Sequence, residues 1–202
     1  KMRRKEIDIL LEGLDKTANS NSYLITLSIK EEKGHLKTDI VQHLRTGSFH
    51  FELVKEDLHR GFNDYSEMIF PKGFASPTFL QKPGNVWNGV EELTIDKIDK
   101  SLAKEMIIDL LTGEQKYFSR SHLGTHINLK MANELVDKFF KSLDENGTWE
   151  SYKIKPDFLN QVDDYYNTNY IQLGYFENNK RDFALAIKYE DEVNVLLTNG
   201  YG

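Results

Sequence analysis

Two short segments of alternating hydrophobicity, one near each end of the chain, constrain the fold more than any other feature of the sequence. In residues 23–29 every second side chain is large and apolar (Tyr23, Ile25, Leu27 and Ile29). Residues 183–189 repeat this pattern (Phe183, Leu185, Ile187 and Tyr189). A period of two is typical of a strand with one buried face, so both segments predict strands of an antiparallel sheet.

Further strands are expected beside each of these segments. Residues 31–34 suit a hairpin turn, after which residues 35–43 would return as a second strand and residues 49–53 as a third. Residues 40–44 also suit a helix, and this alternative stays open. Near the C-terminal end, residues 170–176 and 193–198 flank the strand at 183–189. The sequence therefore predicts two meander-like groups of strands.

Amphipathic helices are predicted from apolar residues that recur with the helical period. The segments are residues 4–17, a helix from an N-cap at Thr94 to about Thr112 with Gly113 as its C-terminal cap, residues 131–143, and a short helix that begins at Pro156. Together with the strands they predict an α+β fold, in which about four helices pack on one face of an antiparallel sheet.

The length of 202 residues and the 39% hydrophobic content are enough for one domain with a substantial core. Residues 60–90 interrupt the regular pattern with three of the four prolines and several large aromatic residues, including Tyr65, Phe74 and Trp87. Prolines at this density exclude a continuous helix or a central strand. We expect an irregular segment whose aromatic side chains either pack on the core or bind a partner.

Composition excludes several classes of function. The chain has no cysteine, which removes disulfides, thiolate catalysis and cysteine-ligated metals. A net charge of −6 argues against a general nucleic-acid-binding protein. No apolar run reaches the roughly 20 residues of a membrane-spanning helix. Phosphate-loop, dinucleotide-binding and nucleophile-elbow motifs are missing, so we predict no cofactor and no metal.

The negative charge is concentrated in the last third of the chain. Acids and bases balance up to residue 130, whereas residues 131–202 hold 13 acids and 7 bases. The compartment stays open because the chain begins with Lys1-Met2: it is cytoplasmic, or extracytoplasmic if a leader or anchor precedes Lys1.

One local cluster suggests catalysis. Residues 119–126 contain two imidazoles, three hydroxyls and a guanidinium, including Arg120, His122, Thr125 and His126. Two histidines four residues apart can share a metal or transfer protons, and Arg120 can pair with a phosphate. The alternative is a loop before the helix at 131–143, in which the hydroxyls act as caps. The other histidines, His35, His43, His50 and His59, have no ligand spacing, although His43 and His50 would approach each other across the predicted turn at 45–47.

The concentrated acidic charge favours a binding function. We expect a non-enzymatic module that engages a basic protein partner, as an inhibitor or immunity-type protein, through an acidic C-terminal face, the aromatic segment at 60–90, or both. The expected partner-binding residues are Asp163, Asp164, Glu190, Asp191, Glu192, Tyr65, Phe74 and Trp87. The alternative is a hydrolase or phosphoesterase that uses His122 and His126.

Overall fold

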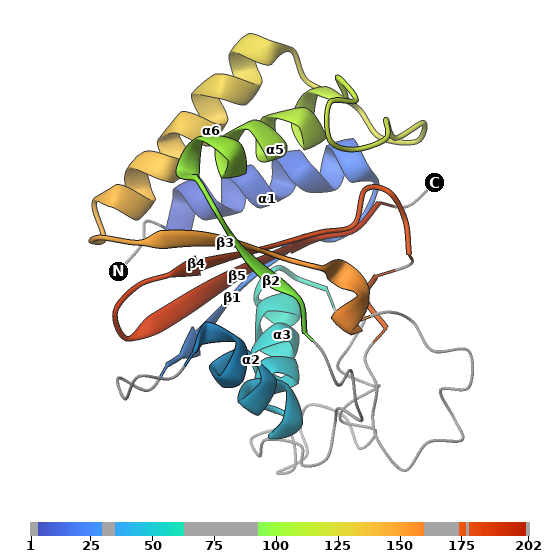
Figure 1. The fold of residues 1–202 in the computed structure, drawn as a ribbon. Coiled ribbons are helices and arrows are strands. Elements are labelled where there is room, and N and C mark those ends of the chain that lie inside the picture. Colours follow the sequence, from blue (N-terminus) through green and yellow to red (C-terminus); the bar gives the residue numbers. More distant parts are fainter. Residues whose placement is uncertain (1–3, 30–34, 63–92, 160–173, 177, 201–202) are drawn as a thin grey trace.

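A computed structural model describes residues 4–29, 35–62, 93–159, 174–176 and 178–200, which form an antiparallel sheet between two layers of helices (Figure 1). The five strands are β1 (Tyr23–Ser28), β2 (Ile95–Ile98), β3 (Glu150–Ile154), β4 (Phe183–Lys188) and β5 (Glu192–Thr198). Their order across the sheet is β1-β5-β4-β3-β2, and every neighbouring pair is antiparallel. The predicted α+β fold is confirmed.

Helices cover both faces of the sheet, whereas the sequence predicted helices on one face only. A three-helix layer consists of α1 (Arg4–Ala18), α5 (Lys100–Thr112) and α6 (Leu129–Asp144). A two-helix layer on the other face consists of α2 (Leu36–Arg45) and α3 (Ser48–His59), and the 3₁₀ helix Pro156–Leu159 packs into the same core. Residues 183–187 of β4 are all buried because their side chains alternate between the two cores.

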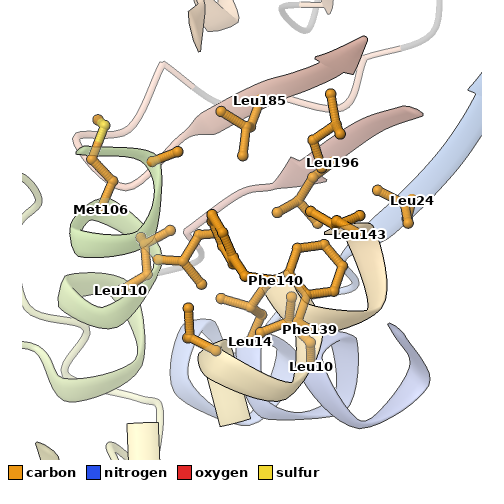
Figure 2. Packing of buried hydrophobic residues seen from close by; sticks show 14 of the residues in the cluster. Leu10, Leu14, Leu24, Met106, Leu110, Phe139, Phe140, Leu143, Leu185 and Leu196 are labelled. Carbon is orange, nitrogen blue, oxygen red and sulfur yellow. The ribbon is translucent and has the colours of Figure 1, made fainter. Parts of the chain in front are cut away.

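The core under the three-helix layer unites segments from the whole length of the chain (Figure 2). Leu10 and Leu14 of α1 and Phe139 of α6 are buried against Leu185 and Leu196 of the sheet. Each fully buried side chain of this size stabilises the fold by about 1.5–3 kcal/mol relative to an exposed one. This packing, rather than local propensity, holds the three helices on the sheet.

The predicted strands at residues 35–43 and 49–53 are wrong, because these residues form α2 and α3. Leu36, Ile40 and Leu44 recur every four residues and are buried on one side of α2. The helix that residues 40–44 offered as an alternative is therefore the correct one. Gly47 joins the two helices with a φ of 74°, a conformation that favours glycine. The first predicted group of strands therefore contains only β1, which pairs with β5 instead.

Other element predictions had mixed outcomes. The helices at 4–17 and 131–143 and the strands at 23–29, 183–189 and 193–198 are confirmed. The helix expected from Thr94 begins at Lys100, since residues 95–98 pair with β3 and Asp99 takes the N-cap position; Gly113 ends it as predicted. β3 was not predicted. The turn at 31–34, most of the strand at 170–176 and nearly all of the segment at 60–90 lie outside the described residues.

No helix within the described ranges combines the length and the apolar character that crossing a membrane requires.

Candidate functional site: an acidic groove at the β4–β5 turn

A groove of about 600 Å³ opens where the turn between β4 and β5 meets the first turns of α1 and the end of α6. We call it the acidic groove. The described residues that line it are Arg4, Ile7, Thr26, Asn146, Tyr189, Asp191, Glu192 and Asn194. They come from four parts of the chain that only the tertiary fold brings together.

The register of β1 on β5 explains why the floor of this groove is polar. Leu24 pairs with Leu196 and both belong to the core under the three-helix layer. Two residues further along the same face, Thr26 pairs with Asn194, and the next pair on this face contains Glu192. Because alternate residues of a strand share a face, this side of the sheet changes from apolar to polar toward the turn.

Asn194 orients the polar groups of the floor, although its side chain is fully buried. Its Oδ1 accepts a hydrogen bond from the hydroxyl of Thr26 at 2.6 Å, and its Nδ2 donates to Oε1 of Glu192 at 3.2 Å. A buried amide with both ends bonded is held in one orientation. Asn194 therefore positions the carboxylate of Glu192 at the mouth of the groove.

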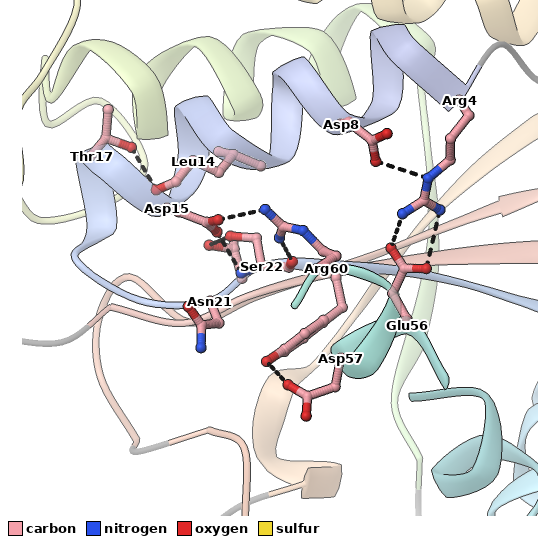
Figure 3. A network of polar contacts seen from close by, with 12 residues as sticks. Arg4, Asp8, Leu14, Asp15, Thr17, Asn21, Ser22, Glu56, Asp57 and Arg60 are labelled. Atoms are coloured by element: carbon pink, nitrogen blue, oxygen red, sulfur yellow. Dashed lines mark hydrogen bonds and ion pairs between the residues drawn. The ribbon is translucent and has the colours of Figure 1, made fainter. Parts of the chain in front are cut away.

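The electrostatic balance of the groove is negative. Arg4 is the one cation among the described lining residues, and its guanidinium already contacts two carboxylates (Figure 3). The bonds run to Glu56 at 3.1 and 2.5 Å and from Nε to Asp8 at 2.8 Å. By contrast, Asp191 and Glu192 form no ion pair within the described ranges. Two carboxylates thus lack a cationic partner there.

Tyr189 links the groove to the end of α6. Its hydroxyl donates to the carbonyl oxygen of Leu143 at 3.0 Å. Burial is the main cause that raises the pKa of Tyr189 to about 12; a hydrogen bond with Asn146 opposes this shift, and the charges of Glu192 and Asp144 contribute to it. Tyr189 is only 6% exposed, so it joins the groove to the core under the three-helix layer and presents little of its ring to solvent.

Exposed acids surround the groove. Glu190 and Asp191 occupy the β4–β5 turn, and Asp144 and Glu145 stand at the end of α6. Asp144 also accepts a hydrogen bond from Nε1 of Trp149 at 2.9 Å and pairs with Lys100 at 3.4 Å. We use the name acidic face for Asp144, Glu145, Glu190, Asp191 and Glu192.

The predicted partner-binding residues divide into two groups. Glu190, Asp191 and Glu192 gather at the groove, whereas Asp163, Asp164, Tyr65, Phe74 and Trp87 lie outside the described residues. Sequence reasoning missed Asn194, although one signal was visible: it is a lone amide in an otherwise apolar strand, residues 193–197. The contributions of Arg4, Ile7, Thr26 and Asn146 had no sequence signal, because they depend on the tertiary fold.

The histidine cluster at residues 119–126 lies in the loop between α5 and α6. His122, Arg120 and Thr125 are exposed, and Leu123 between them is 61% exposed. The ring of His126 bonds through Nε2 to the carbonyl oxygen of Ser121 at 3.1 Å and packs on Gly113, where an added Cβ would come within 2.9 Å of it. His126 thus helps to hold this loop against the end of α5.

Main-chain bonds anchor the same loop to α1 and α5. The N–H of Thr125 donates to the carbonyl oxygen of Lys16 at 2.7 Å, and that of Ile127 donates to Leu111 at 3.0 Å. Gly124 passes so close to Thr17 that an added Cβ would overlap its carbonyl oxygen. Asn128 caps α6 by accepting from the N–H of Met131 at 2.9 Å.

The four remaining histidines lie in different surroundings. His43 bonds through Nε2 to the carbonyl oxygen of Ser28 at 2.5 Å, His50 is fully buried in α3, and His35 and His59 are exposed. Among the described residues no group of three or more histidine, aspartate or glutamate side chains could hold a metal ion.

Comparisons with known protein families, with curated proteins and with solved structures found no match to this chain. Its function is therefore inferred from its own residues.

Proposed function

We propose that this protein is a non-enzymatic binding module that captures a basic protein partner at the acidic groove, in the manner of an inhibitor or immunity protein. One observation carries the proposal: the carboxylates of Asp191 and Glu192 have no cationic partner among the described residues, while Arg4, the cation beside them, is already paired. Such a groove attracts positive charge.

The groove has the dimensions and lining for a basic side chain. Its volume of about 600 Å³ lies in the usual range of ligand pockets. Ile7 and Tyr189 line the groove with the small part of their apolar surface that the core leaves exposed, against which the aliphatic stem of an arginine or lysine would lie, and Glu192 offers a carboxylate that Asn194 has oriented. Pre-orientation reduces the entropy lost on binding.

The surrounding acids support fast association. Glu190, Asp144 and Glu145 extend the negative charge beyond the groove on the exposed surface. A field of one sign steers an oppositely charged partner and raises the association rate by roughly 10–1000-fold at low ionic strength. The acidic residues would set the association rate and the preference for a basic partner, while the apolar lining contributes to the affinity of the complex.

The test is capture of partners by the immobilised protein, followed by titration of each purified partner at low and high salt. The variant Glu190→Lys/Asp191→Lys/Glu192→Lys should lose binding, and the wild type should bind more weakly as salt rises. The matched control, Glu12→Lys/Asp96→Lys/Glu114→Lys, makes the same change in net charge at exposed positions outside the groove lining and should bind as the wild type does. Equal binding by both triple variants, or binding that salt leaves unchanged, would contradict the proposal.

The hydrolase alternative rests on His122 and His126 and is tested by ester and phosphoester substrates with and without Zn²⁺ or Mn²⁺. Activity that His122→Ala/His126→Ala abolishes would favour it over the binding module. The bond from His126 to Ser121 supports a role in holding the loop instead.

A further inference from the structure

A second groove lies on the outer surface of the three-helix layer, between α1 and α6, with a volume of about 360 Å³. These two helices contact each other, and Gly13 of α1 lies close to Leu135 of α6 next to the groove. The described residues that line it are Lys5, Glu6, Ile9, Met131, Glu134, Leu135 and Lys138. We call this surface the α1–α6 groove.

Exposed apolar side chains mark this surface. Ile9 is 45% exposed and Met131 is 53% exposed, which places them among the few large apolar side chains that the described part of the chain leaves in water. Amphipathic helices at the surface of a protein usually turn their large apolar side chains toward the core. This exposed apolar pair gives the groove an apolar centre from which a contact with another molecule would exclude water.

The charges around the α1–α6 groove are balanced, and the described residues do not pair with them. Lys5 and Lys138 supply two positive charges, and Glu6 and Glu134 supply two negative ones. None of the four forms an ion pair with another described residue, whereas their neighbours Lys104 and Asp137 pair with each other, as do Arg4 and Asp8. One oxygen of Glu6, Oε2, is even buried without a hydrogen-bond partner in that part of the chain.

We propose that the α1–α6 groove is the interface of a two-fold symmetric homodimer, in which α1 and α6 of one copy pack on α1 and α6 of a second copy. A two-fold interface uses the same surface on both copies, so that surface must complement itself. Two lysines and two glutamates around an apolar centre leave this surface without net charge, so two copies of it do not repel each other. A strongly basic or strongly acidic partner would instead favour a rim of one sign.

The charge pattern permits a direct test by sedimentation velocity over a range of concentrations. The wild type should shift from the 23.5 kDa of one chain toward twice that mass as concentration rises. Lys5→Glu/Lys138→Glu makes all four rim charges negative, and Glu6→Lys/Glu134→Lys makes them all positive. Each double variant alone should dimerise at least roughly tenfold more weakly than the wild type, because like charges then face each other.

Mixing the two double variants in equal amounts should restore a dimer, since a negative rim then meets a positive one. This rescue separates an interface from a folding defect, which mixing would not repair. Lys37→Glu/Arg45→Glu reverses two exposed cations on α2, in the other helical layer, and should dimerise as the wild type does. A wild type that stays at the mass of one chain, double variants that dimerise normally, or a mixture that fails to associate would each overturn the proposal.

Discussion

His50 places an ionisable group in the interior of the protein. Its side chain is fully buried in α3, and neither ring nitrogen has a hydrogen-bond partner within the described residues. Burial lowers the pKa of His50 from 6.5 to about 4. A histidine in this setting stays neutral at physiological pH and acts as a core residue rather than as a ligand.

The lowered pKa of His50 predicts a loss of stability in acid. Between pH 6.5 and about 4 the unfolded chain binds a proton at His50 that the folded chain does not, so the free energy of unfolding falls as pH falls through this window. The total loss approaches about 3 kcal/mol at the lower end. Urea unfolding of His50→Met should show a shallower pH dependence than the wild type, and His59→Met, which changes an exposed histidine of the same helix, should not. Equal pH dependence in all three proteins would contradict the prediction.

Arg181 is a second buried ionisable residue, with 1% of its surface exposed. Its guanidinium donates to the carbonyl oxygens of Ser119 at 2.7 Å and Leu110 at 3.1 Å. Burial lowers the pKa of Arg181, and the charge of Asp109 partly offsets this effect. The carboxylate of Asp109 in turn accepts three main-chain N–H bonds from residues 116–118 at 2.8–3.0 Å. Arg181 and Asp109 thus hold the loop between α5 and α6 on the end of α5.

We expect Arg181→Met to lower the free energy of unfolding by about 3 kcal/mol, because it leaves the carbonyl groups of Ser119 and Leu110 without their donor and removes the positive charge near Asp109. Arg181→Lys should recover little of the loss, since one ammonium group cannot reproduce the two-armed geometry. Urea unfolding measures both, with Lys180→Met as the control at the exposed neighbouring position. A loss below about 0.5 kcal/mol, as at an ordinary surface site, would show that Arg181 is dispensable.

At the scale of elements, β1 is an edge strand whose outer side is covered by ion pairs between α1 and α3 (Figure 3). Arg60, which directly follows α3, pairs with Asp15 of α1 at 2.6 Å and donates to the carbonyl oxygen of Ser22. Asp15 also accepts from the N–H of Ser22 at 2.6 Å, and burial raises its pKa although Arg60 opposes this shift. Arg4 and Glu56 form the second link. Covering an edge in this way prevents pairing with another chain.

The two links differ in burial, so their removal should differ in cost. The Arg60 side chain is 7% exposed, whereas that of Arg4 is 38% exposed. Arg60→Met should cost about 3 kcal/mol because it removes a nearly buried guanidinium that bonds both Asp15 and Ser22, and Arg4→Met should cost less, about 1–2 kcal/mol, because the more exposed Arg4 still leaves the buried carboxylate of Glu56 without its partner. Urea unfolding gives both values, and hydrogen exchange should show lost protection in β1 for Arg60→Met. Equal costs for the two variants would contradict the role of burial.

The whole molecule depends on β4 and β5, because they supply side chains to both cores. Leu185 and Leu196 face the three-helix layer, while Ala184, Ala186 and Val195 face the two-helix layer. A change in one core should therefore weaken the other. This expectation also tests the prediction of a single domain.

We expect Leu185→Ala to lower the free energy of unfolding by about 3 kcal/mol through the cavity that it leaves. Native-state hydrogen exchange should show similar losses of protection in α6 and in α3, which lie on opposite faces of the sheet. Leu123→Ala, at a side chain that is 61% exposed, should change neither helix. Loss confined to α6 would mean that the two layers unfold separately.

Periodicity predicted the elements that carry one strong pattern and failed where two patterns coexist. In α6 the apolar residues recur only with the helical period, so its prediction was confirmed. In α3 the large apolar residues Phe49, Phe51 and Leu53 alternate as they would in a strand. The segment nevertheless forms a helix, because α3 packs along β1. β2 is short and charged, and pairing with β3 rather than its own composition makes it a strand.

The sequence by itself determined the class of fold and the acidic trio of residues 190–192, because hydrophobic period and charge are local properties. Only the tertiary structure decided that helices cover both faces of the sheet and that α1 and β1 complete the acidic groove. The physical reason is the pairing of β1 with β5, which joins residues about 170 positions apart by main-chain hydrogen bonds. Contacts across such a separation depend on how the whole core packs, and no window of sequence contains them.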